Sequence, residues 1–215
     1  MRLVLLGPPG AGKGTQGQAL AARLGVPHVA TGDLIRDHIA RRTEFGCKVE
    51  AAIAEGNFAS DEDILYWVSR RLKETDARSG YILDGFPRDL AQARAFPHPL
   101  DLVFWLGMDD EALIGRMAGR LVCPVCGTVY HVAYRPPRLN GCCDREGACL
   151  VRRPEDAPEK LHYRLVLNES QMGPLEPYYD AAGLMVHVDA VGTPEEVTSR
   201  ILDVLSARHL ANPVF

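Results

Sequence analysis

The sequence has no apolar run long enough to cross a membrane, and its net charge is small. Of its 215 residues 47% are hydrophobic, and 24 basic against 28 acidic side chains leave a formal net charge of −4. A membrane-spanning helix needs about 20 apolar residues, and the apolar run at the N-terminus, residues 3–6, is far shorter. We therefore expect a cytoplasmic protein without a signal peptide, in which anion binding depends on local clusters of basic residues.

Lysine is scarce, and internal repeats and low-complexity segments are absent. Four of the 24 basic residues are lysines and 20 are arginines, the side chain that binds phosphate through two parallel hydrogen bonds. Without repeats, the length fits one large domain or one core with insertions. The six cysteines favour a metal site over disulfides, because the cytosol keeps thiols reduced.

A phosphate-binding pattern stands at the start of the chain. Residues 2–6 are typical of a buried strand, residues 16–24 have helical spacing, and GPPGAGKGT (7–15) joins them. Glycines let several backbone N–H groups converge on one anion, and the helix N-terminus and Lys13 add positive charge. The usual motif has Ser or Thr directly after the lysine, whereas here Gly14 precedes Thr15. This context predicts a site for nucleotide phosphates.

A second informative stretch is an apolar strand that ends in an acid. Residues 81–83 are apolar, and Asp84 follows them at a position typical of the acid that holds Mg²⁺, often through water. The next residues, Gly85 and Pro87, end the strand and project Arg88 at the carboxyl edge of the sheet, where ligands of open α/β sheets bind. Because Gln92 comes four residues after Arg88, we expect it at the same edge.

Strand and helix patterns alternate along most of the chain. Further strands are expected at 26–30, 101–107 and 184–188. Thr31 is expected to be the N-cap of the helix that follows the first of them, and Thr193, or Gly192 before it, to start the last helix. This alternation predicts a doubly wound parallel sheet with helices on both faces.

Two other helices carry basic residues. A helix from Asp109 to Arg120 would place Arg116 and Arg120 four residues apart on one face, an arrangement that favours an anion between them. Arg164 lies on a later helix, which Pro174 and Pro177 are expected to kink or break.

The stretch 121–153 interrupts the alternation and contains five of the six cysteines. CPVCG (123–127) is typical of a metal knuckle, because two thiolates separated by two residues precede a turn glycine. A second half follows at 142–149. Short strands around two such knuckles predict a small zinc ribbon.

The residues leave the fourth metal ligand open. Glu146 follows Cys143 with the same spacing as in the first knuckle, and a carboxylate is an acceptable zinc ligand. Cys149 is the rival, since thiolate is the softer ligand, but it would need a wider loop. Cys142 points away from its neighbour in any extended segment, so we do not expect it to bind together with Cys143.

Taken in order, these motifs resemble the adenylate kinases, in the long bacterial form with a zinc-bearing lid. The resemblance covers nearly the whole chain and rests on GPPGAGKGT (7–15), TGDLIR (31–36), LDGFPR (83–88) with Gln92, GRMAGR (115–120), CPVCG (123–127), and Arg153 with Arg164. A glycine loop alone indicates a nucleoside triphosphate site, whereas the ordered series is typical of nucleoside monophosphate kinases.

The resemblance implies an α/β fold with a doubly wound parallel five-stranded sheet, a helical AMP-binding insertion and a small β zinc-ribbon lid. The implied core comprises residues 1–29, 60–121 and 160–215, the insertion 30–59 and the lid 122–159. The implied reaction is reversible phosphoryl transfer from MgATP to AMP, which gives two ADP. Mg²⁺ with ATP and a structural Zn²⁺ are the implied cofactors. The implied protein is a monomer that binds ATP, AMP and ADP but no nucleic acid or membrane.

The resemblance also implies roles for individual residues. The residues implied to act on the transferred group are Lys13, Asp84, Arg88, Arg120, Arg153 and Arg164. Those implied to bind ATP are Gly10, Ala11, Gly12, Lys13, Gly14, Thr15, Arg116 and Arg120. Those implied to bind AMP are Thr31, Arg36, Asn57, Phe58, Ala59, Gly85, Arg88, Gln92, Arg153 and Arg164. The implied metal ligands are Cys123, Cys126, Cys143 and Glu146.

The sequence departs from the family pattern at several positions. Residues 57–59 are Asn-Phe-Ala where the family usually has Leu and Val at the last two positions, but these contacts are made largely by the backbone, so we expect AMP binding to persist. Asp89 replaces the usual Thr, Glu155 replaces Asp, and Glu146 replaces Cys or Asp at the metal site.

Two alternative functions remain open from the sequence. One is a kinase for UMP or CMP, although the amide of Gln92 suits the donor–acceptor edge of adenine. The other is a zinc-ribbon nucleic-acid module that uses ATP as a switch. The nearly neutral charge balance, and arginines spread along the chain instead of forming one stripe, argue against the second.

Overall fold

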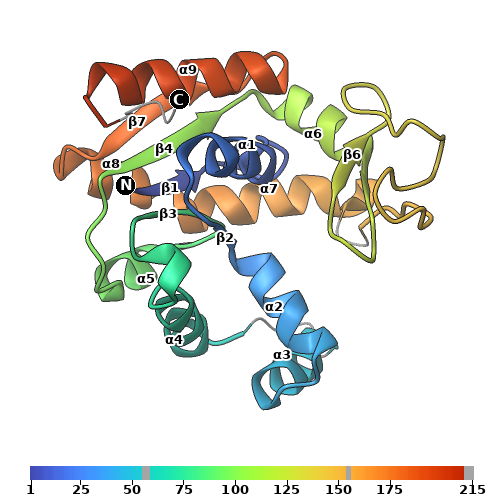
Figure 1. Ribbon diagram of the computed structural model, residues 1–215, viewed down its shortest axis with the longest axis horizontal. Helices are drawn as coiled ribbons and strands as arrows, with labels where there is room; N and C mark the ends of the chain where they lie inside the picture. Colours follow the sequence, from blue (N-terminus) through green and yellow to red (C-terminus); the bar gives the residue numbers. More distant parts are fainter. Residues whose placement is uncertain (55–58, 154–155, 211–215) are drawn as a thin grey trace.

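Five parallel strands form the centre of the molecule (Figure 1). The computed structural model describes residues 1–54, 59–153 and 156–210. The sheet order is β2-β3-β1-β4-β7, with neighbours paired in parallel, which confirms the expected doubly wound sheet. The strands are β1 (Arg2–Leu6), β2 (His28–Ala30), β3 (Tyr81–Asp84), β4 (Leu102–Gly107) and β7 (Met185–Asp189).

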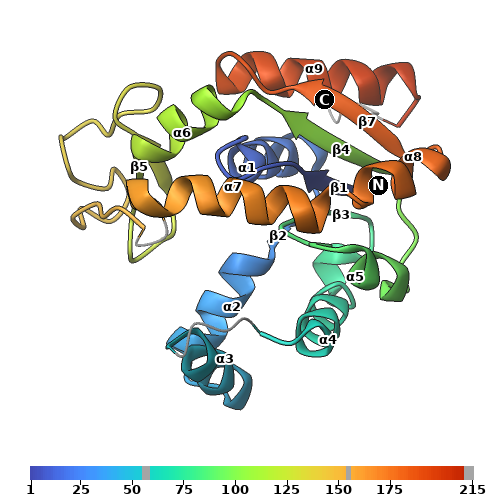
Figure 2. The ribbon, with the colours of Figure 1, turned by 180° about the vertical axis from the view of Figure 1, so that it is seen from behind.

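Helices cover both faces of this sheet (Figures 1 and 2). Side chains of β1 alternate between two hydrophobic cores, since Leu3 and Leu5 belong to one and Val4 and Leu6 to the other, all of them fully buried. The first core includes residues of α1 (Lys13–Leu24), α6 (Asp110–Ala118), α7 (Pro158–Met172) and α9 (Pro194–Ala207). The second includes residues of α4 (Asp61–Arg71), the short η1 (Thr75–Ala77), α5 (Leu90–Ala95) and α8 (Leu175–Ala181). A strand with both faces covered needs an apolar residue at each buried position, as at residues 3–6 of β1.

Several helix boundaries follow the local sequence. Ser60 and Asp109 cap α4 and α6 by accepting hydrogen bonds from backbone N–H groups, and Thr193 forms a capping box at α9. The chain breaks between α7 and α8 at Pro174, as expected. Pro177 lies in the first turn of α8, where its missing N–H has no intrahelical partner to lose, so it does not break the helix.

The expected N-cap role of Thr31 is wrong. Thr31 is the first residue of α2 (Thr31–Ala40), and Ala30 occupies the cap position without a side-chain hydrogen bond. The Thr31 hydroxyl donates instead to the carbonyl oxygen of Gly85 at 2.9 Å. A tertiary contact with the segment after β3 therefore uses the group that could have capped the helix.

Two segments extend from the body (Figure 1). The first is an arm formed by α2 and α3 (Glu44–Ala54), which meets α4 through rings: the centroids of His38 and Phe45 lie 4.1 and 5.3 Å from that of Trp67. The second is the lid between α6 and α7, built on the antiparallel pair β5 (Arg120–Val122) and β6 (Val129–His131). None of the described helices is both long and apolar enough to serve as a membrane span.

Candidate active site

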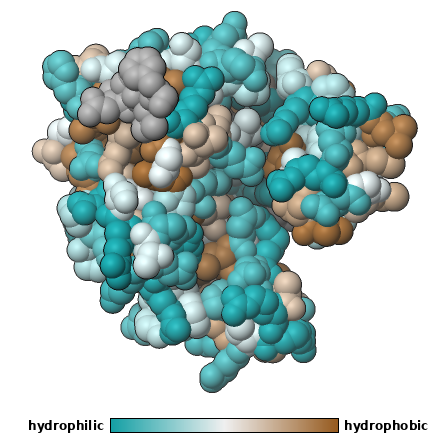
Figure 3. Space-filling model, in the orientation of Figure 1, coloured by the Kyte–Doolittle hydropathy of each residue, from teal (hydrophilic) through white to brown (hydrophobic). Residues whose placement is uncertain are grey.

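A cavity of about 470 Å³ opens where the body, the arm and the lid meet. Its lining comes from the loop before α1, the ends of β2 and β3, both lid strands, α7 and the segment before α9. The surface is hollowed between body and lid (Figure 3). Because the carboxyl ends of β1, β2 and β3 face this hollow, the cavity lies where an open parallel sheet binds its ligands.

The loop between β1 and α1 has the backbone of a phosphate-binding loop. Gly10 and Gly12 have φ values of +89° and +93°, a region that other residues rarely adopt. A Cβ at Gly10 would lie 3.0 Å from the carbonyl oxygen of Leu113, so this glycine also permits close packing on α6. At Gly14 a Cβ would lie 3.4 Å from Oδ2 of Asp84, an ordinary contact distance, so Gly14 lies beside this acid.

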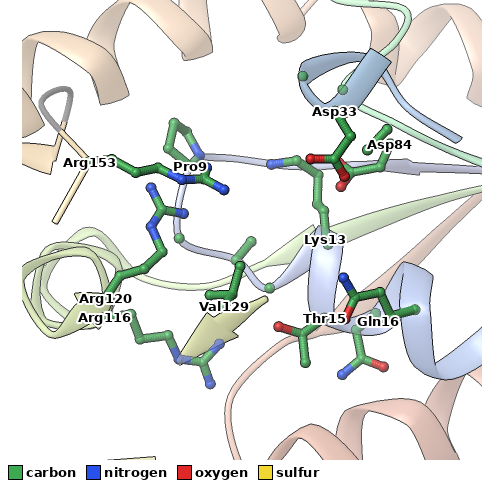
Figure 4. A pocket seen from close by; sticks show the side chains of 18 of the residues that line it. Pro9, Lys13, Thr15, Gln16, Asp33, Asp84, Arg116, Arg120, Val129 and Arg153 are labelled. Carbon is green, nitrogen blue, oxygen red and sulfur yellow. The ribbon is translucent and has the colours of Figure 1, made fainter. Parts of the chain in front are cut away.

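Lys13 is tied to the loop that precedes it. Its Nζ donates to the carbonyl oxygens of Gly7 at 2.6 Å and Pro8 at 2.8 Å. Burial lowers the pKa of the Lys13 ammonium from 10.5 to about 8, and the carboxylate of Asp84 opposes that shift. Figure 4 displays Lys13 and Asp84 side by side in the cavity. The lysine is thus preorganised as a charge beside the loop.

The lowered pKa predicts a pH dependence. Below about pH 8 Lys13 carries its charge, and as the pH rises through that value the unliganded protein loses it. For the MgATP-dependent activity that the resemblance implies, we therefore expect kcat/KM, which reports ionisation of the unliganded protein, to fall on the alkaline side. In Lys13→Arg the guanidinium stays protonated, so the same fall should move to higher pH. Identical alkaline limbs in both proteins would assign the ionisation to another group.

His28, which the sequence analysis did not single out, reaches the same acid. Its Nε2 lies 3.5 Å from Oδ2 of Asp84, and it lines the cavity. Gly17 on α1 provides the space, because a Cβ there would come within 2.3 Å of Nε2. The only sequence feature that could have indicated this contact is the presence of a histidine in the strand before the TGDLIR motif.

The predicted AMP residues of the body lie together after β3. Arg88 lines the cavity and donates from Nε to the carbonyl oxygen of Gly85 at 3.1 Å. Its burial lowers the pKa of its guanidinium, and Asp84 opposes the shift. The buried amide of Gln92 accepts from the N–H of Arg88 at 2.9 Å and donates to Asp61 at 2.6 Å. These contacts give Gln92 one orientation.

On the arm, Thr31 and Arg36 also line the cavity. Arg36 is exposed and forms an ion pair with Asp33. Ala59 follows the arm, whereas the predicted positions Asn57 and Phe58 lie outside the described residues. The arm thus contributes a guanidinium to the cavity wall, and a hydroxyl that contacts Gly85 in the segment after β3.

Arg116 and Arg120 do not share a helical face, contrary to the expectation. The helix α6 ends at Ala118, and Arg120 begins β5, because pairing with β6 takes over there. Arg116 donates to the carbonyl oxygens of Ala190 and Gly192, both at 3.0 Å. Both arginines nevertheless line the cavity, together with Arg153 (Figure 4).

Arg120 and Arg164 share one buried carboxylate. Arg120 binds both oxygens of Asp156, at 2.7 and 2.5 Å, and Arg164 binds its Oδ1 at 2.7 Å. The Asp156 side chain is 1% exposed, so both guanidinium groups hold a fixed position at the base of the lid. The sequence analysis did not identify Asp156, whose partners stand 36 and 8 residues away.

Tyr134 is a second lid residue that the sequence analysis passed over. The guanidinium of Arg116 lies 5.9 Å from the centre of its ring, which is 66% exposed and lines the cavity. An aromatic face opposite a planar guanidinium leaves space for a flat, polarisable group. A tyrosine in a loop-rich stretch carries no local pattern that predicts this placement.

The lid holds a candidate metal site. The thiols of Cys123, Cys126 and Cys143 lie within 4.8 Å of one another, and no other cysteine or carboxylate among the described residues joins the group. Tyr130 accepts a hydrogen bond from the N–H of Asp144 at 2.8 Å, and its hydroxyl lies 3.5 Å from the Cys143 sulfur. That hydroxyl lowers the pKa of Cys143 to about 6, which favours the thiolate that metals bind.

The two halves of this site share one backbone turn. The N–H of Gly127 donates to the carbonyl oxygen of Cys123 at 3.0 Å, and the N–H of Gly147 donates to the carbonyl oxygen of Cys143 at 2.8 Å. Both glycines have left-handed φ values, +69° and +65°. Glu146, although exposed, therefore occupies the place in the second turn that Cys126 occupies in the first.

This correspondence predicts the outcome of substitutions at the metal site. We expect one zinc per chain, lost in Glu146→Ala and kept in Cys149→Ser, because residue 146 has the same place in the second turn as the ligand Cys126 has in the first. Mass spectrometry of metal content checks both variants. The reverse result would make Cys149 the fourth ligand, and a metal-free parent protein would exclude the site.

Comparison with known proteins gives a consistent result. The adenylate kinase family model matches residues 5–184. An adenylate kinase from an Anaeromyxobacter species is 44% identical over 212 residues, which cover 94% of this chain and 99% of that protein. The adenylate kinase of Streptomyces avermitilis is 42% identical over 213 residues, covering 95% and 97%. That of Caldicellulosiruptor saccharolyticus is 41% identical over 214 residues, covering 96% and 98%. The chain therefore belongs to the adenylate kinase family, the ATP:AMP phosphotransferases.

Proposed function

We propose that this adenylate kinase transfers a phosphoryl group in line from MgATP to AMP, giving two ADP, through the residues of the cavity. The observation that carries the assignment is the meeting of Lys13, Arg88, Arg120, Arg153 and Arg164 in one cavity from separate segments. Several cations at one place suit a site where the negative charge of two nucleotides must be neutralised during transfer.

The ATP side of the proposed site comprises the loop 10–15, Arg116 on α6 and Arg120 on β5. Backbone N–H groups of the loop and Lys13 suit the phosphates. Arg116 stands opposite Tyr134, an arrangement suited to the flat adenine ring. Arg120, which Asp156 holds and whose charge acts on Lys13, is proposed to bind phosphate.

The AMP side of the proposed site lies between the arm and the segment after β3. Arg88 and Arg36 offer guanidinium groups for the AMP phosphate, and Thr31 and Gly85 are in contact through a hydrogen bond. Gln92 is proposed to recognise adenine. Its amide already has partners on both sides, so adenine binding would use the remaining capacity of the amide oxygen or exchange one partner.

Asp84 is the residue proposed to hold Mg²⁺ through water. Its carboxylate lines the cavity close to Lys13 and the first turn of α1, which fits a hard cation that keeps several waters. When bound with ATP, Mg²⁺ supplies charge neutralisation at the phosphate oxygens. His28 lies near this acid, with its Nε2 3.5 Å from Oδ2 of Asp84. The acceptor phosphate is already ionised, so the residues need only bind, align and shield it.

Closure of the lid is proposed to exclude water from the transfer. The lid and arm, at 122–159 and 30–59, are the proposed moving parts of the implied domain organisation. Arg153 and Arg164 are proposed to meet the transferring group only in the closed form, since water is a competing nucleophile at an open site.

A structural zinc ion is proposed in the lid, held by the three clustered thiols and Glu146. The donor set fits zinc, which takes four sulfur, nitrogen or oxygen ligands in closed structural sites. Four protein ligands leave no open position, so the ion would only stabilise the lid. We also propose that the enzyme is a cytoplasmic monomer without nucleic-acid or membrane partners.

A coupled assay tests the acceptor assignment. We expect Mg²⁺-dependent ADP formation from ATP with AMP as the best acceptor, because the Gln92 amide suits adenine. The same assay with UMP and CMP is the comparison. A higher kcat/KM for either pyrimidine nucleotide would overturn the proposal, as would ADP formation independent of any monophosphate.

A further inference from the structure

Two cysteines that the metal site does not use face each other in the lid. Cys142 and Cys149 form an antiparallel bridge. The flanking hydrogen bonds run from Leu150 to Gly141 and from Cys143 to Ala148, both at 2.8 Å. The bridged residues exchange no backbone hydrogen bond with each other, which makes them a non-hydrogen-bonded pair.

This position brings two side chains into the range of a disulfide. At non-hydrogen-bonded pairs the Cα atoms approach to about 4.5 Å and the side chains are closest. A disulfide needs Cα atoms about 4.4–6.8 Å apart and Cβ atoms about 3.5–4.5 Å apart. Directly opposed residues also project to the same face of the ladder. The backbone therefore needs little movement to join the two sulfurs.

We propose that Cys142 and Cys149 form an oxidisable dithiol, a site of reversible thiol modification separate from the metal-binding thiols. Cys149 is exposed and Cys142 is half-buried, so a small oxidant can reach the pair. The ligand class of this site is a low-molecular-weight disulfide such as oxidised glutathione. Cys142 and Cys149, seven positions apart in the sequence, oppose each other at one bridge, whereas Cys47 lies on α3.

The pair is separated from the metal cluster by the alternation of the extended chain. Successive residues of an extended segment point to opposite faces, and Cys143 is buried beside Cys123 and Cys126. Its neighbour Cys142 therefore points away from the cluster. The inference rests on the proposed metal ligands in one respect, since it requires that Cys149 bind no metal.

The chemical step exchanges one disulfide for another. The Cys149 thiolate attacks one sulfur of the small disulfide, which forms a mixed disulfide and expels one small thiolate. The Cys142 thiolate then attacks the Cys149 sulfur, closes the protein disulfide and expels the second small thiolate. Two protein thiols are oxidised and one small disulfide is reduced to two thiols, and the two protons that the protein thiols lose are taken up by the two expelled thiolates.

The disulfide would close the loop that carries the second metal turn. Residues 143–148 lie between the two cysteines, and this segment includes Cys143 and Glu146. Neither Cys142 nor Cys149 is among the residues that line the cavity. Oxidation should therefore restrict the lid loop and leave the chemistry of the nucleotide site in place.

Counting thiols under defined redox conditions tests the proposal. The metal-loaded protein is equilibrated in glutathione buffers from reducing to oxidising, alkylated, and mapped by peptide mass spectrometry. The expected result is the joint loss of two alkylatable thiols, Cys142 and Cys149, in one linked peptide, reversed by dithiothreitol. Cys47→Ser, the matched control, should show the same loss. Cys142→Ser and Cys149→Ser should stop at a mixed disulfide with glutathione.

Other results would overturn the proposal. It fails if the wild-type protein keeps both thiols alkylatable in the most oxidising buffer, or if either cysteine is found linked to Cys123, Cys126 or Cys143. Metal content is measured in parallel and should be equal in both redox states. Zinc lost from Cys149→Ser would instead overturn the ligand assignment on which the inference rests, and this result is independent of the enzyme assay.

Discussion

Replacing Lys13 with methionine is expected to lower turnover by about 100-fold or more. Methionine keeps much of the length of the side chain but removes the charge. In the structure the ammonium is held by two carbonyl oxygens of the loop, so its position is set before nucleotide arrives. A fixed charge of this kind stabilises the transferring phosphoryl group without reorganisation. Steady-state kinetics with saturating ATP and AMP measures the effect.

A matched substitution tests whether the loss of a lysine outside the cavity has the same effect on turnover. Lys73 is exposed just after α4 and is not among the residues that line the cavity, so Lys73→Met should retain parental turnover. Circular dichroism of both variants checks the fold. If folded Lys13→Met keeps the parental turnover, Lys13 has no part in the proposed mechanism, and the assignment of the phosphate-binding loop is wrong.

The second large effect is expected at Asp156, which no motif singled out. Asp156→Asn keeps the size of the side chain but removes the charge that holds Arg120 and Arg164. Both guanidinium groups would then lose their shared anchor at the base of the lid. We expect turnover to fall by about tenfold or more, because misplaced charges stabilise the transfer poorly.

Stability should fall together with turnover in this variant. Removing the buried carboxylate charge leaves both guanidinium charges uncompensated. Because Arg120 and Arg164 remain 18% and 29% exposed, we expect the free energy of unfolding to fall by about 2 kcal/mol, at or below the usual range for buried pairs. Thermal unfolding with and without nucleotide measures the loss. Asp203→Asn on the exposed side of α9 is the control and should match the parent. If Asp156→Asn keeps the parental activity and stability, the two ion pairs of Asp156 contribute to neither.

The features predicted correctly from sequence depend on neighbours along the chain. The start of the molecule combines a buried strand, glycines with positive φ and a lysine within 15 residues, and each of these has a local physical signature. The end of β3 at Asp84 is equally local. Helix caps at Asp109 and Thr193 depend on backbone groups three residues away.

Local patterns failed where a distant segment competed for the same group. Thr31 suits a helix cap, but the carbonyl of Gly85, 54 residues away, takes its hydroxyl. Arg120 fits the helical spacing with Arg116, but pairing with β6 draws it into a strand. In both cases a tertiary hydrogen bond replaced the one that local propensity favoured.

The sequence by itself determined the order of strands and helices, the phosphate-binding loop, the acid after β3 and the thiols of the lid. Only the tertiary structure decided which charges act together. Arg120 meets Asp156 across 36 residues and Arg116 meets Ala190 across 74, and His28 reaches Asp84 through space left by Gly17. The physical reason is that such contacts depend on how sheet and lid bring separate segments together, and spacing along the chain carries no measure of that distance.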